Sequence, residues 1–291
     1  MHLEKIVTLA NQNTRLRFIA MERSLRATGC NLPLWVIPYD EKKFDLPVNA
    51  HWWELENVLH WLEVHHAHRM MRKYQCLLES NYQFVDSDVI FLKNPERELT
   101  SFSGFITSCG HWHNPEHVIT KEVLTFFDKS TTTWQQKIFN AGQFACDKRL
   151  YNFDELKQIA EQPEYKASCI SFRFHDQPGL NLLVNLSGIS VTNITLQPYC
   201  MESTWAGDYT DEDYSRFWKN ESKKPYIIHW AGCSMSTNRP IDKLFLGYLT
   251  KQEREEWNKK LAVITATRNT FQSKLKTRLR KMKAAVKLAV R

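Results

Sequence analysis

Two aspartates that follow an apolar, β-favouring stretch constrain this chain most. Residues 82–92 read Tyr-Gln-Phe-Val-Asp-Ser-Asp-Val-Ile-Phe-Leu, so one residue separates Asp86 from Asp88. In an extended backbone the side chains at positions i and i+2 point the same way, so both carboxylates can face one point at the strand end. Carboxylate oxygens at this spacing suit Mg²⁺ or Mn²⁺. A simple turn is the alternative, since Asp and Ser are common turn residues.

The order of strand-like and helix-like segments predicts an α/β fold. The two types alternate along the first half of the chain, which indicates a mostly parallel sheet covered by helices on both faces. We expect strands at 5–10, 34–39, 84–85 and 105–109, and helices at 14–27, 54–79 with a break near His65, and 122–127. Gly29 suits the C-cap of the first helix.

The carboxyl ends of the expected strands carry polar residues. Ligands of open α/β sheets bind beyond these ends, where Asn11, Asp40 and Asp86 would lie. No GxGxxG motif follows the first strand and the sequence contains no P-loop, which argues against a dinucleotide-binding or NTPase fold.

Charge is distributed unevenly along the chain. The net charge is +7, yet the last acidic residue is Glu256 and eleven Lys or Arg residues follow it. The part up to Glu256 therefore holds 28 basic residues against 32 acidic ones, a net charge of −4. A domain with this balance lacks the basic surface that binds nucleic acid, and we predict no nucleic-acid partner.

The cysteines and the apolar runs predict a cytoplasmic protein. The seven cysteines are odd in number and far apart, so they form no zinc-binding or redox pair and are expected to be reduced. Charged and polar residues interrupt every apolar run in the first 30 residues. No uncharged apolar run approaches the length of about 18 residues that a spanning helix needs. Neither a signal peptide nor a transmembrane helix is expected.

Three further segments in the second half of the chain contain polar residues in unusual settings. They are Ile-Phe-Asn-Ala-Gly-Gln-Phe at 138–144, Asp-Gln-Pro-Gly-Leu-Asn at 176–181 and Ile-Ile-His-Trp-Ala-Gly at 227–232. Each has a structural alternative. Asn140 suits a turn, Asp176 and Gln177 could cap a helix that starts near Pro178, and His229 could be a packed or surface histidine.

Together with the Asp pair, these segments resemble a GT-A glycosyltransferase, most closely glycosyltransferase family 8 and its nucleotide-diphospho-sugar transferase relatives. That family carries Asp-x-Asp after a strand, then Phe-Asn-Ala/Ser-Gly, Asp-Gln-x-x-Leu-Asn and His-aromatic-x-Gly. The four motifs occur here in the same order, over roughly residues 3–240. The resemblance implies the GT-A fold, a Rossmann-like, mostly parallel sheet flanked by helices. The family's late Lys-Pro-Trp is missing, since 233–240 reads Cys-Ser-Met-Ser-Thr-Asn-Arg-Pro.

The resemblance implies roles for individual residues. Those implied for the metal, Mn²⁺ or Mg²⁺, are Asp86, Asp88 and His229. Those implied near the transferred sugar are Asn140, Asp176 and Gln177, with Asp176 or Gln177 as a possible transient nucleophile. Those implied for the rest of the donor are Asn11, Asn13, Arg69, Asp86 and Arg239, of which Arg239 would replace the missing lysine at the leaving phosphate. The family's tyrosine two positions before Arg69 is Ala67 here, so that correspondence is loose.

The implied function is transfer of a sugar from a nucleotide donor, a UDP-sugar by expectation, to a glycan or lipid-linked acceptor of the cell surface. The family retains the anomeric configuration. One alternative is a sugar-phosphate nucleotidyltransferase, which would normally show a glycine-rich basic loop after the first strand, whereas 9–17 contains no glycine. A second alternative is an inactive, membrane-associated binding protein of the same fold.

Two histidine-containing segments leave their roles open. The cluster His65, His66 and His68 lacks Cys or Glu at metal-binding spacing, which favours solvated or packed histidines over a zinc site. The segment 111–113, His-Trp-His, could line the acceptor site or form an ordinary exposed loop.

The C-terminal segment has a different character from the rest, and we expect a catalytic domain at 1–250 and a tail at 251–291. An apolar stripe with helical spacing runs through Phe271, Leu275, Leu279, Met282, Val286 and Val290, with basic residues on both sides. Such a basic amphipathic helix binds anionic membrane surfaces. We therefore expect peripheral attachment to the inner face of the cell membrane; a solvated helix packed on the main domain is the alternative.

Overall fold

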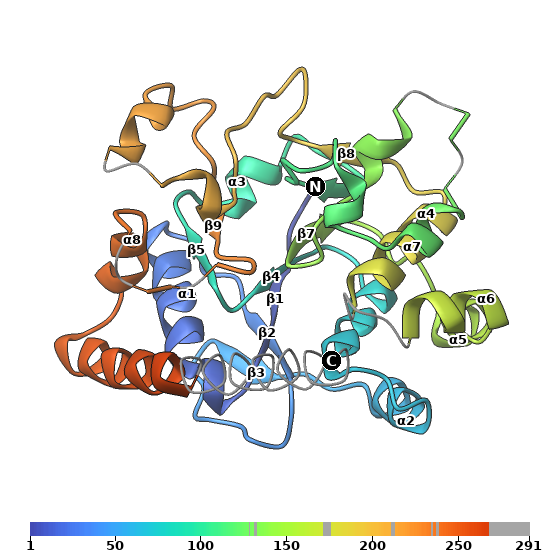
Figure 1. Cartoon of the computed structure of the whole chain (residues 1–291), viewed down its shortest axis with the longest axis horizontal. Coiled ribbons are helices and arrows are strands. Elements are labelled where there is room, and N and C mark those ends of the chain that lie inside the picture. The colour runs from blue at the N-terminus through green and yellow to red at the C-terminus, as the bar shows by residue number, and fades with distance from the viewer. Residues whose placement is uncertain are drawn as a thin grey trace, which may run out of the picture. The chain divides into compact units, whose positions relative to one another are not determined.

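The structure, a computed structural model, describes residues 1–127, 129–130, 133–170, 176–210, 213–233, 235–236 and 239–267. The chain divides into two units, Met1–Tyr248 and Leu249–Arg291. The first contains the sheets and the helices described next (Figure 1).

A mixed sheet forms the centre of the first unit. Its strands are β1 (Lys5–Ala10), β2 (Leu34–Pro38), β3 (Ala50–Trp52), β4 (Tyr82–Asp86), β6 (Phe105–Thr107), β7 (Gln143–Cys146) and β8 (Val191–Asn193). Their order is β3-β2-β1-β4-β7-β6-β8. β3, β2, β1 and β4 are parallel, and so are β6 and β8, whereas β7 is antiparallel to both of its neighbours. The predicted mostly parallel sheet is confirmed.

Helices cover both faces of this sheet. The α-helices are α1 (Arg15–Ala27), α2 (Glu56–Val64), α3 (Pro95–Leu99), α4 (Lys121–Leu124), α5 (Phe153–Ala160), α6 (Pro163–Tyr165), α7 (Gln177–Leu186) and α8 (Asp242–Gly247). Figure 1 shows α1 and α8 on one side of the sheet and α2, α4, α5 and α7 on the other.

Short 3₁₀ and π segments connect these elements. The 3₁₀ segments are η1 (Gln12–Thr14), η2 (Arg69–Leu78), η3 (Pro115–His117), η4 (Trp134–Lys137), η6 (Ala206–Asp208) and η7 (Tyr214–Trp218), and the π segment is η5 (Lys166–Ile170). Two short strands, β5 (Val89–Phe91) and β9 (Ile227–His229), form a separate antiparallel sheet.

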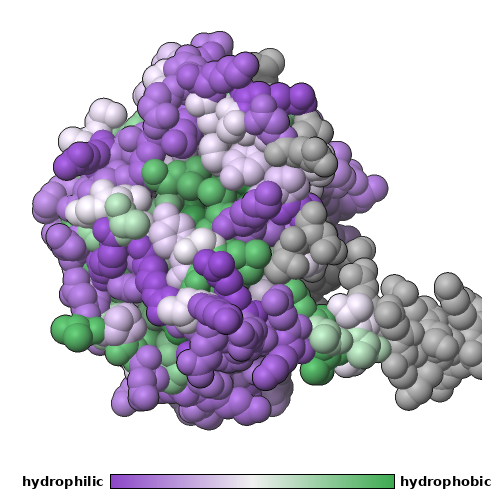
Figure 2. Space-filling view, turned by 90° about the vertical axis from the view of Figure 1, so that its left-hand side faces the viewer, coloured by the Kyte–Doolittle hydropathy of each residue, from purple (hydrophilic) through white to green (hydrophobic). Residues whose placement is uncertain are grey.

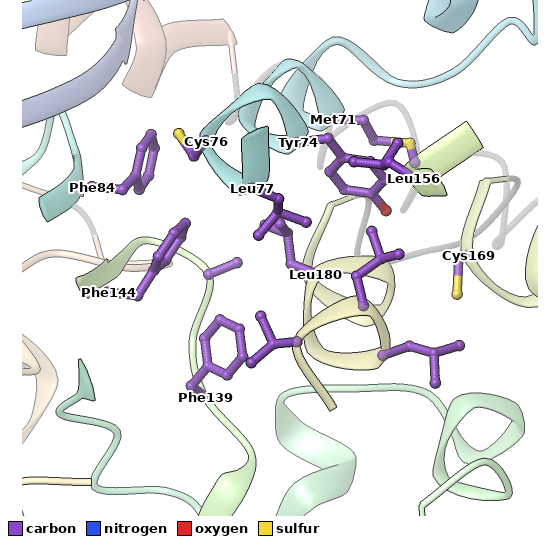
Figure 3. Packing of buried hydrophobic residues seen from close by; sticks show 14 of the residues in the cluster. Met71, Tyr74, Cys76, Leu77, Phe84, Phe139, Phe144, Leu156, Cys169 and Leu180 are labelled. Atoms are coloured by element: carbon purple, nitrogen blue, oxygen red, sulfur yellow. The ribbon is translucent and has the colours of Figure 1, made fainter. Parts of the chain in front are cut away.

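The alternation of side chains along β1 explains why both faces are covered. Ile6 belongs to a buried cluster with Phe18 of α1, whereas its neighbour Val7 belongs to a cluster on the opposite face with Leu77. A strand that is apolar on both sides must be buried on both sides. In the second cluster, Phe84 and Phe144 stack with ring centroids 5.1 Å apart (Figure 3).

One expected helix differs from the structure. The segment 54–79 does not form a single α-helix: α2 ends at Val64, and the chain resumes as the 3₁₀ segment η2. His66 has a φ of 51°, in the left-handed region that ends a helix. The imidazole Nδ1 of His68 then accepts a hydrogen bond from the backbone of Met70 and caps the new segment. The predicted break near His65 is confirmed, and the regular helix after it is wrong.

The second unit begins with a helix over 251–267. The predicted apolar stripe from Phe271 to Val290 lies outside the described residues. Within the described part of the chain, no helix is long and apolar enough to cross a membrane.

On the face shown in Figure 2, hydrophilic residues predominate and hydrophobic ones gather mainly near the centre of the view.

Candidate active site

The candidate metal site lies where β4 ends and β5 begins. Asp86 is the last residue of β4, and Asp88 directly precedes β5. β5 pairs antiparallel with β9, and this register places Val89 opposite His229. The small sheet therefore brings an imidazole from late in the chain to the two carboxylates.

The ligand atoms of these three side chains face one another. His229 Nε2 lies 3.3 Å from Asp88 Oδ1 and 3.8 Å from Asp86 Oδ2. One ligand atom from each residue lies within 4.8 Å of the other two. His229 is buried and both aspartates are half-buried. Two carboxylates and one imidazole are a donor set that suits Mn²⁺ or Mg²⁺ and leaves coordination positions for other ligands.

The electrostatic environment keeps Asp88 ionised. Burial opposes its charge, but the hydrogen bond with His229 and the nearby Arg17 guanidinium lower the pKa of Asp88 to about 2. Arg17 Nη1 lies 3.9 Å from Asp88 Oδ2. A carboxylate that is ionised at neutral pH can accept a cation without first losing a proton.

Gly142 packs directly against the candidate metal site. Its carbonyl oxygen accepts a hydrogen bond of 2.8 Å from the backbone of Asp86. A Cβ atom at this position would lie 2.2 Å from His229 Cε1 and 2.6 Å from Asp86 Oδ2. Only a residue without a side chain allows the backbone to approach the two ligands this closely.

A buried lysine lies behind the site. The side chain of Lys73, on η2, is 1% exposed, and its Nζ lies 2.9 Å from Asp86 Oδ1 and 2.9 Å from Asp176 Oδ2. It also donates to the carbonyl oxygen of Ala141 at 3.3 Å. Burial alone would lower the pKa of Lys73, but the two carboxylates outweigh it and raise the pKa. Lys73 therefore stays charged and links the metal-binding strand to the start of α7.

Side chains of α7 hold the turn at 139–142. Asn181 accepts a hydrogen bond from the backbone of Phe139 at 3.0 Å and donates one to its carbonyl oxygen at 2.8 Å. Gln177 Oε1 accepts a hydrogen bond of 3.1 Å from the backbone of Ala141. The turn that contacts the metal site is thus fixed to a buried helix by three hydrogen bonds.

The three residues implied near the transferred sugar lie close to this turn. Asn140 accepts a hydrogen bond of 2.8 Å from the backbone of Gly142. Gln177 also donates to the carbonyl oxygen of Val118, so both ends of its amide bind backbone groups. Asp176 is the N-cap residue of α7 but makes no side-chain capping bond, and its carboxylate is paired with Lys73. The helix expected near Pro178 is confirmed.

Two cavities adjoin the candidate metal site. The strand-end cavity, of about 280 Å³, is lined by residues 9–11, 13–14, 17, 39, 70 and 86–88. The loop cavity, of about 200 Å³, is lined by residues 108–111, 117–118, 140, 143, 204–205, 229 and 231. Asp86 and Asp88 belong to the wall of the first and His229 to the wall of the second, so the candidate metal ligands contribute to both.

The loop cavity combines an indole wall with polar groups. Trp205 donates a hydrogen bond of 2.8 Å to the carbonyl oxygen of Ala231, and His111 meets its ring edge-on with centroids 4.9 Å apart. Gln143 is 4% exposed, and its Oε1 has no hydrogen-bond partner among the described residues. A buried, unpartnered amide oxygen in a cavity that an indole also lines suits a ligand that carries hydroxyl groups.

The expected donor-binding residues divide between cavity and periphery. Asn11 and Asn13 line the strand-end cavity, and Asn11 donates a hydrogen bond of 2.8 Å to Asp40. Arg69 is outside this lining; its Nη1 lies 3.6 Å from Asp40 Oδ2. Arg239 lines neither cavity and is ion-paired with Asp242 at 3.0 Å, in the first turn of α8.

The two histidine-containing segments, 65–68 and 111–113, have different surroundings in the structure. His65 Nε2 lies 3.3 Å from Glu161 Oε1, and His68 caps η2, so both have structural partners. His111 lines the loop cavity, whereas Trp112 and His113 are not part of its wall. His111 thus lines a cavity, and a role of the segment 111–113 in acceptor binding stays a prediction.

Sequence reasoning missed four residues of the two cavities and their junction. They are Arg17, Lys73, Gln143 and Trp205. A lysine or arginine on a predicted helix normally faces solvent, so Lys73 and Arg17 gave no local signal. Gln143 directly follows the Phe-Asn-Ala-Gly motif, and this position was the one available signal for it.

Comparison with known proteins adds to this geometry. The family model of nucleotide-diphospho-sugar transferases matches residues 65–245. A search of curated protein sequences finds no match.

Solved structures match the fold. A crystal structure of an active-site mutant of LgtC has a TM-score of 0.56 at 12% identity, over 86% of this chain and 99% of LgtC. The galactosyltransferase LgtC in complex with donor and acceptor sugar analogues has a TM-score of 0.51 at 11% identity, with the same coverage. The bifunctional glycosyltransferase WbbM has a TM-score of 0.54 at 14% identity, over 88% of this chain and 51% of WbbM. These likenesses show a GT-A fold.

Proposed function

Because this chain belongs to the nucleotide-diphospho-sugar transferase family and is a glycosyltransferase, we propose that it is a metal-dependent, retaining enzyme that uses a UDP-sugar. The acceptor in this proposal is a glycan or lipid-linked sugar of the cell surface. Retention and the choice of UDP rest on the four sequence motifs that resemble glycosyltransferase family 8.

One observation carries the proposal. The three candidate metal ligands belong to the walls of two cavities, with Asp86 and Asp88 in one and His229 in the other. A nucleotide sugar has a diphosphate at its centre, a nucleoside on one side and a sugar on the other. We assign the nucleoside to the strand-end cavity, the diphosphate to the metal site and the sugars to the loop cavity.

Asp86, Asp88 and His229 would hold Mn²⁺ or Mg²⁺, and the close approach of Gly142, which leaves no space for a side chain beside two of these ligands, supports this assignment. A bound divalent cation supplies positive charge to a diphosphate that becomes more negative as the sugar leaves. The two carboxylates suit Mn²⁺ and Mg²⁺ alike, since both ions prefer oxygen ligands.

The chain's own residues would orient the sugar. Asn140 lines the loop cavity, and its turn is fixed by Gln177 and Asn181. Because Gln177 binds backbone groups at both ends and Asp176 is paired with Lys73, we assign both a positioning role rather than that of nucleophile. Misplacement of a reacting group by about 1 Å can lower a rate about 100-fold.

We also propose that the segment 251–291 attaches the enzyme to the inner face of the cell membrane, next to a lipid-linked acceptor. The support is the charge of this segment, which includes all eleven basic residues that follow Glu256. Deletion of 260–291 should abolish sedimentation with anionic liposomes and leave nucleotide binding intact. Unchanged liposome binding would overturn this part of the proposal.

Calorimetric titration of UDP, GDP and CDP in the presence of Mn²⁺ tests the donor site. We expect UDP to bind, and to lose affinity about 1,000-fold with EDTA or in Asp88→Ala, since a bound metal contributes several kcal/mol at a diphosphate. The matched control is Asp154→Ala, which removes an exposed carboxylate on α5. Binding of GDP or CDP instead would correct the base, and binding of none would overturn the proposed function.

A further inference from the structure

Arg17 lies in the first turn of α1 and lines the strand-end cavity. Its side chain is 33% exposed, and its Nη1 lies 3.9 Å from Asp88 Oδ2. This distance is longer than a tight charged hydrogen bond of about 2.8 Å. The guanidinium therefore lies near a candidate metal ligand, in the wall of the cavity to which we assign the nucleoside.

The charges of the site require a further cation. One divalent ion would balance the carboxylates of Asp86 and Asp88. Lys73 lies 2.9 Å from both Asp86 and Asp176, so its charge is already opposed by that of Asp176. The diphosphate of a nucleotide sugar adds about two negative charges, and charge that is partly removed from water needs a partner.

Arg17 is the candidate for this partner. Among the described side chains that line the strand-end cavity, it is the only basic one. The start of α1 adds to the positive potential, because Thr14 and Arg17 place the first helical turn, with its positive dipole end, at the cavity wall.

Arg239, the residue that the sequence suggested for the leaving phosphate, is engaged elsewhere. Its guanidinium is paired with Asp242, whose side chain is 1% exposed, and it donates a hydrogen bond to Ala206. Asp242 also accepts a hydrogen bond of 2.7 Å from Trp230. Moving Arg239 to a phosphate would leave a buried carboxylate without its cation, which is costly.

We propose that Arg17 binds the diphosphate of the donor and is the main side-chain cation that does so. This inference rests on the proposed function and deepens it. The planar guanidinium can donate two parallel hydrogen bonds to phosphate oxygens, and a short side-chain movement away from Asp88 is enough to reach a diphosphate held at the metal site.

The test compares ligands with and without phosphates in one protein. Affinities of UDP and uridine would be measured by calorimetry with Mn²⁺ present, for the unsubstituted chain, Arg17→Gln, Arg17→Lys and Arg15→Gln. Arg15 lies in the same helical turn but does not line the cavity, so it controls for the loss of charge from α1. Mn²⁺ affinity without nucleotide would be measured in each protein, and circular dichroism would verify folding.

We expect Arg17→Gln to weaken UDP binding about 10- to 100-fold, the effect of losing charged hydrogen bonds, with uridine and Mn²⁺ affinities within twofold. Arg17→Lys should lose less, because it keeps the charge. Equal losses for UDP and uridine, a loss confined to Mn²⁺ affinity, or a UDP-specific loss in Arg239→Gln but not in Arg17→Gln would overturn the inference while leaving the proposed function intact. Failure of the unsubstituted chain to bind any nucleotide would overturn both.

Discussion

The strand-end cavity and the loop cavity share the candidate metal site but are built from different kinds of structure. The first is formed by the carboxyl ends of the parallel strands β1, β2 and β4 and by the start of α1. The second is formed largely by connecting segments around 108–111, 117–118 and 204–205. Strand ends offer a fixed geometry, whereas connecting segments vary in length and composition.

This difference suggests a division of labour. In an enzyme of this fold, a rigid half can bind the part of the donor that all related enzymes share, and a loop-built half can select the sugar and the acceptor. Gly142 and Lys73 contact the candidate metal ligand Asp86, at the junction between the two cavities. Substitutions of these two residues should then affect both halves, whereas substitutions of residues that line one cavity should affect only that half.

The largest effect is expected at the junction, for Lys73→Met. Removing the ammonium leaves the buried Asp176 and the half-buried Asp86 without their cation, and unpairing a buried charge costs about 3–5 kcal/mol. Urea titration would measure the lower free energy of unfolding. Adding Asp176→Asn should recover part of the loss, because it removes one of the stranded charges.

A surface pair provides the control for that experiment. Lys157→Met breaks an exposed contact of 4.0 Å with Glu161 on α5 and should change the free energy of unfolding by less than about 0.5 kcal/mol. If Lys73→Met unfolded at the same urea concentration as the unsubstituted protein, the ion pairs of Lys73 with Asp86 and Asp176 would not stabilise the fold.

A smaller effect is expected for Gly142→Ala. The new methyl group would collide with His229 and Asp86, so these ligands must move apart, and displaced metal ligands commonly cost about 10- to 100-fold in metal affinity. Titration of Mn²⁺ would measure it. Gly247→Ala on α8 is the matched substitution, because nothing lies within 4 Å of its added Cβ. Equal Mn²⁺ affinities in the two variants would contradict the packing argument.

The smallest predicted changes in affinity distinguish the roles of the two cavities. Asn13→Ala in the strand-end cavity should weaken nucleotide binding about two- to tenfold, the value of one hydrogen bond. Trp205→Ala in the loop cavity should leave nucleotide affinity within twofold. Calorimetric titration with the best-binding nucleotide would measure the affinities of both variants. A larger loss in Trp205→Ala than in Asn13→Ala would reverse the assignment of the cavities.

The sequence predicts the rigid half of the site better than the loop-built half, and the reason is physical. β1 and β4 are mostly apolar, with Asn11 directly after β1 and Asp86 at the end of β4, so their ends can be located from pattern alone. The loop cavity depends on where segments far apart in sequence meet. Trp205 carries no local pattern that indicates this meeting, and Gln143 is marked only by its position after the Phe-Asn-Ala-Gly motif.

The stretch after α2 shows where periodicity fails. Arg69–Leu78 contains enough apolar residues to predict an α-helix, but the structure has a 3₁₀ segment whose residues are mostly buried, Lys73 included. Tertiary contacts override helix propensity here, since Lys73 must reach two carboxylates and Gln75 donates to the carbonyl oxygen of Trp53 at 3.1 Å. A buried polar network of this kind is visible only once its partners are placed.

The pairing of β5 with β9 also has a consequence for how the chain folds. Because Val89 lies opposite His229, we expect the third metal ligand to join the two aspartates late in folding. Closing so long a loop has an entropic cost, and contacts this distant in sequence slow folding. A folding intermediate without β9 would retain the aspartates but lack the imidazole. Acquisition of metal affinity during refolding would therefore report the completion of the fold rather than its first collapse.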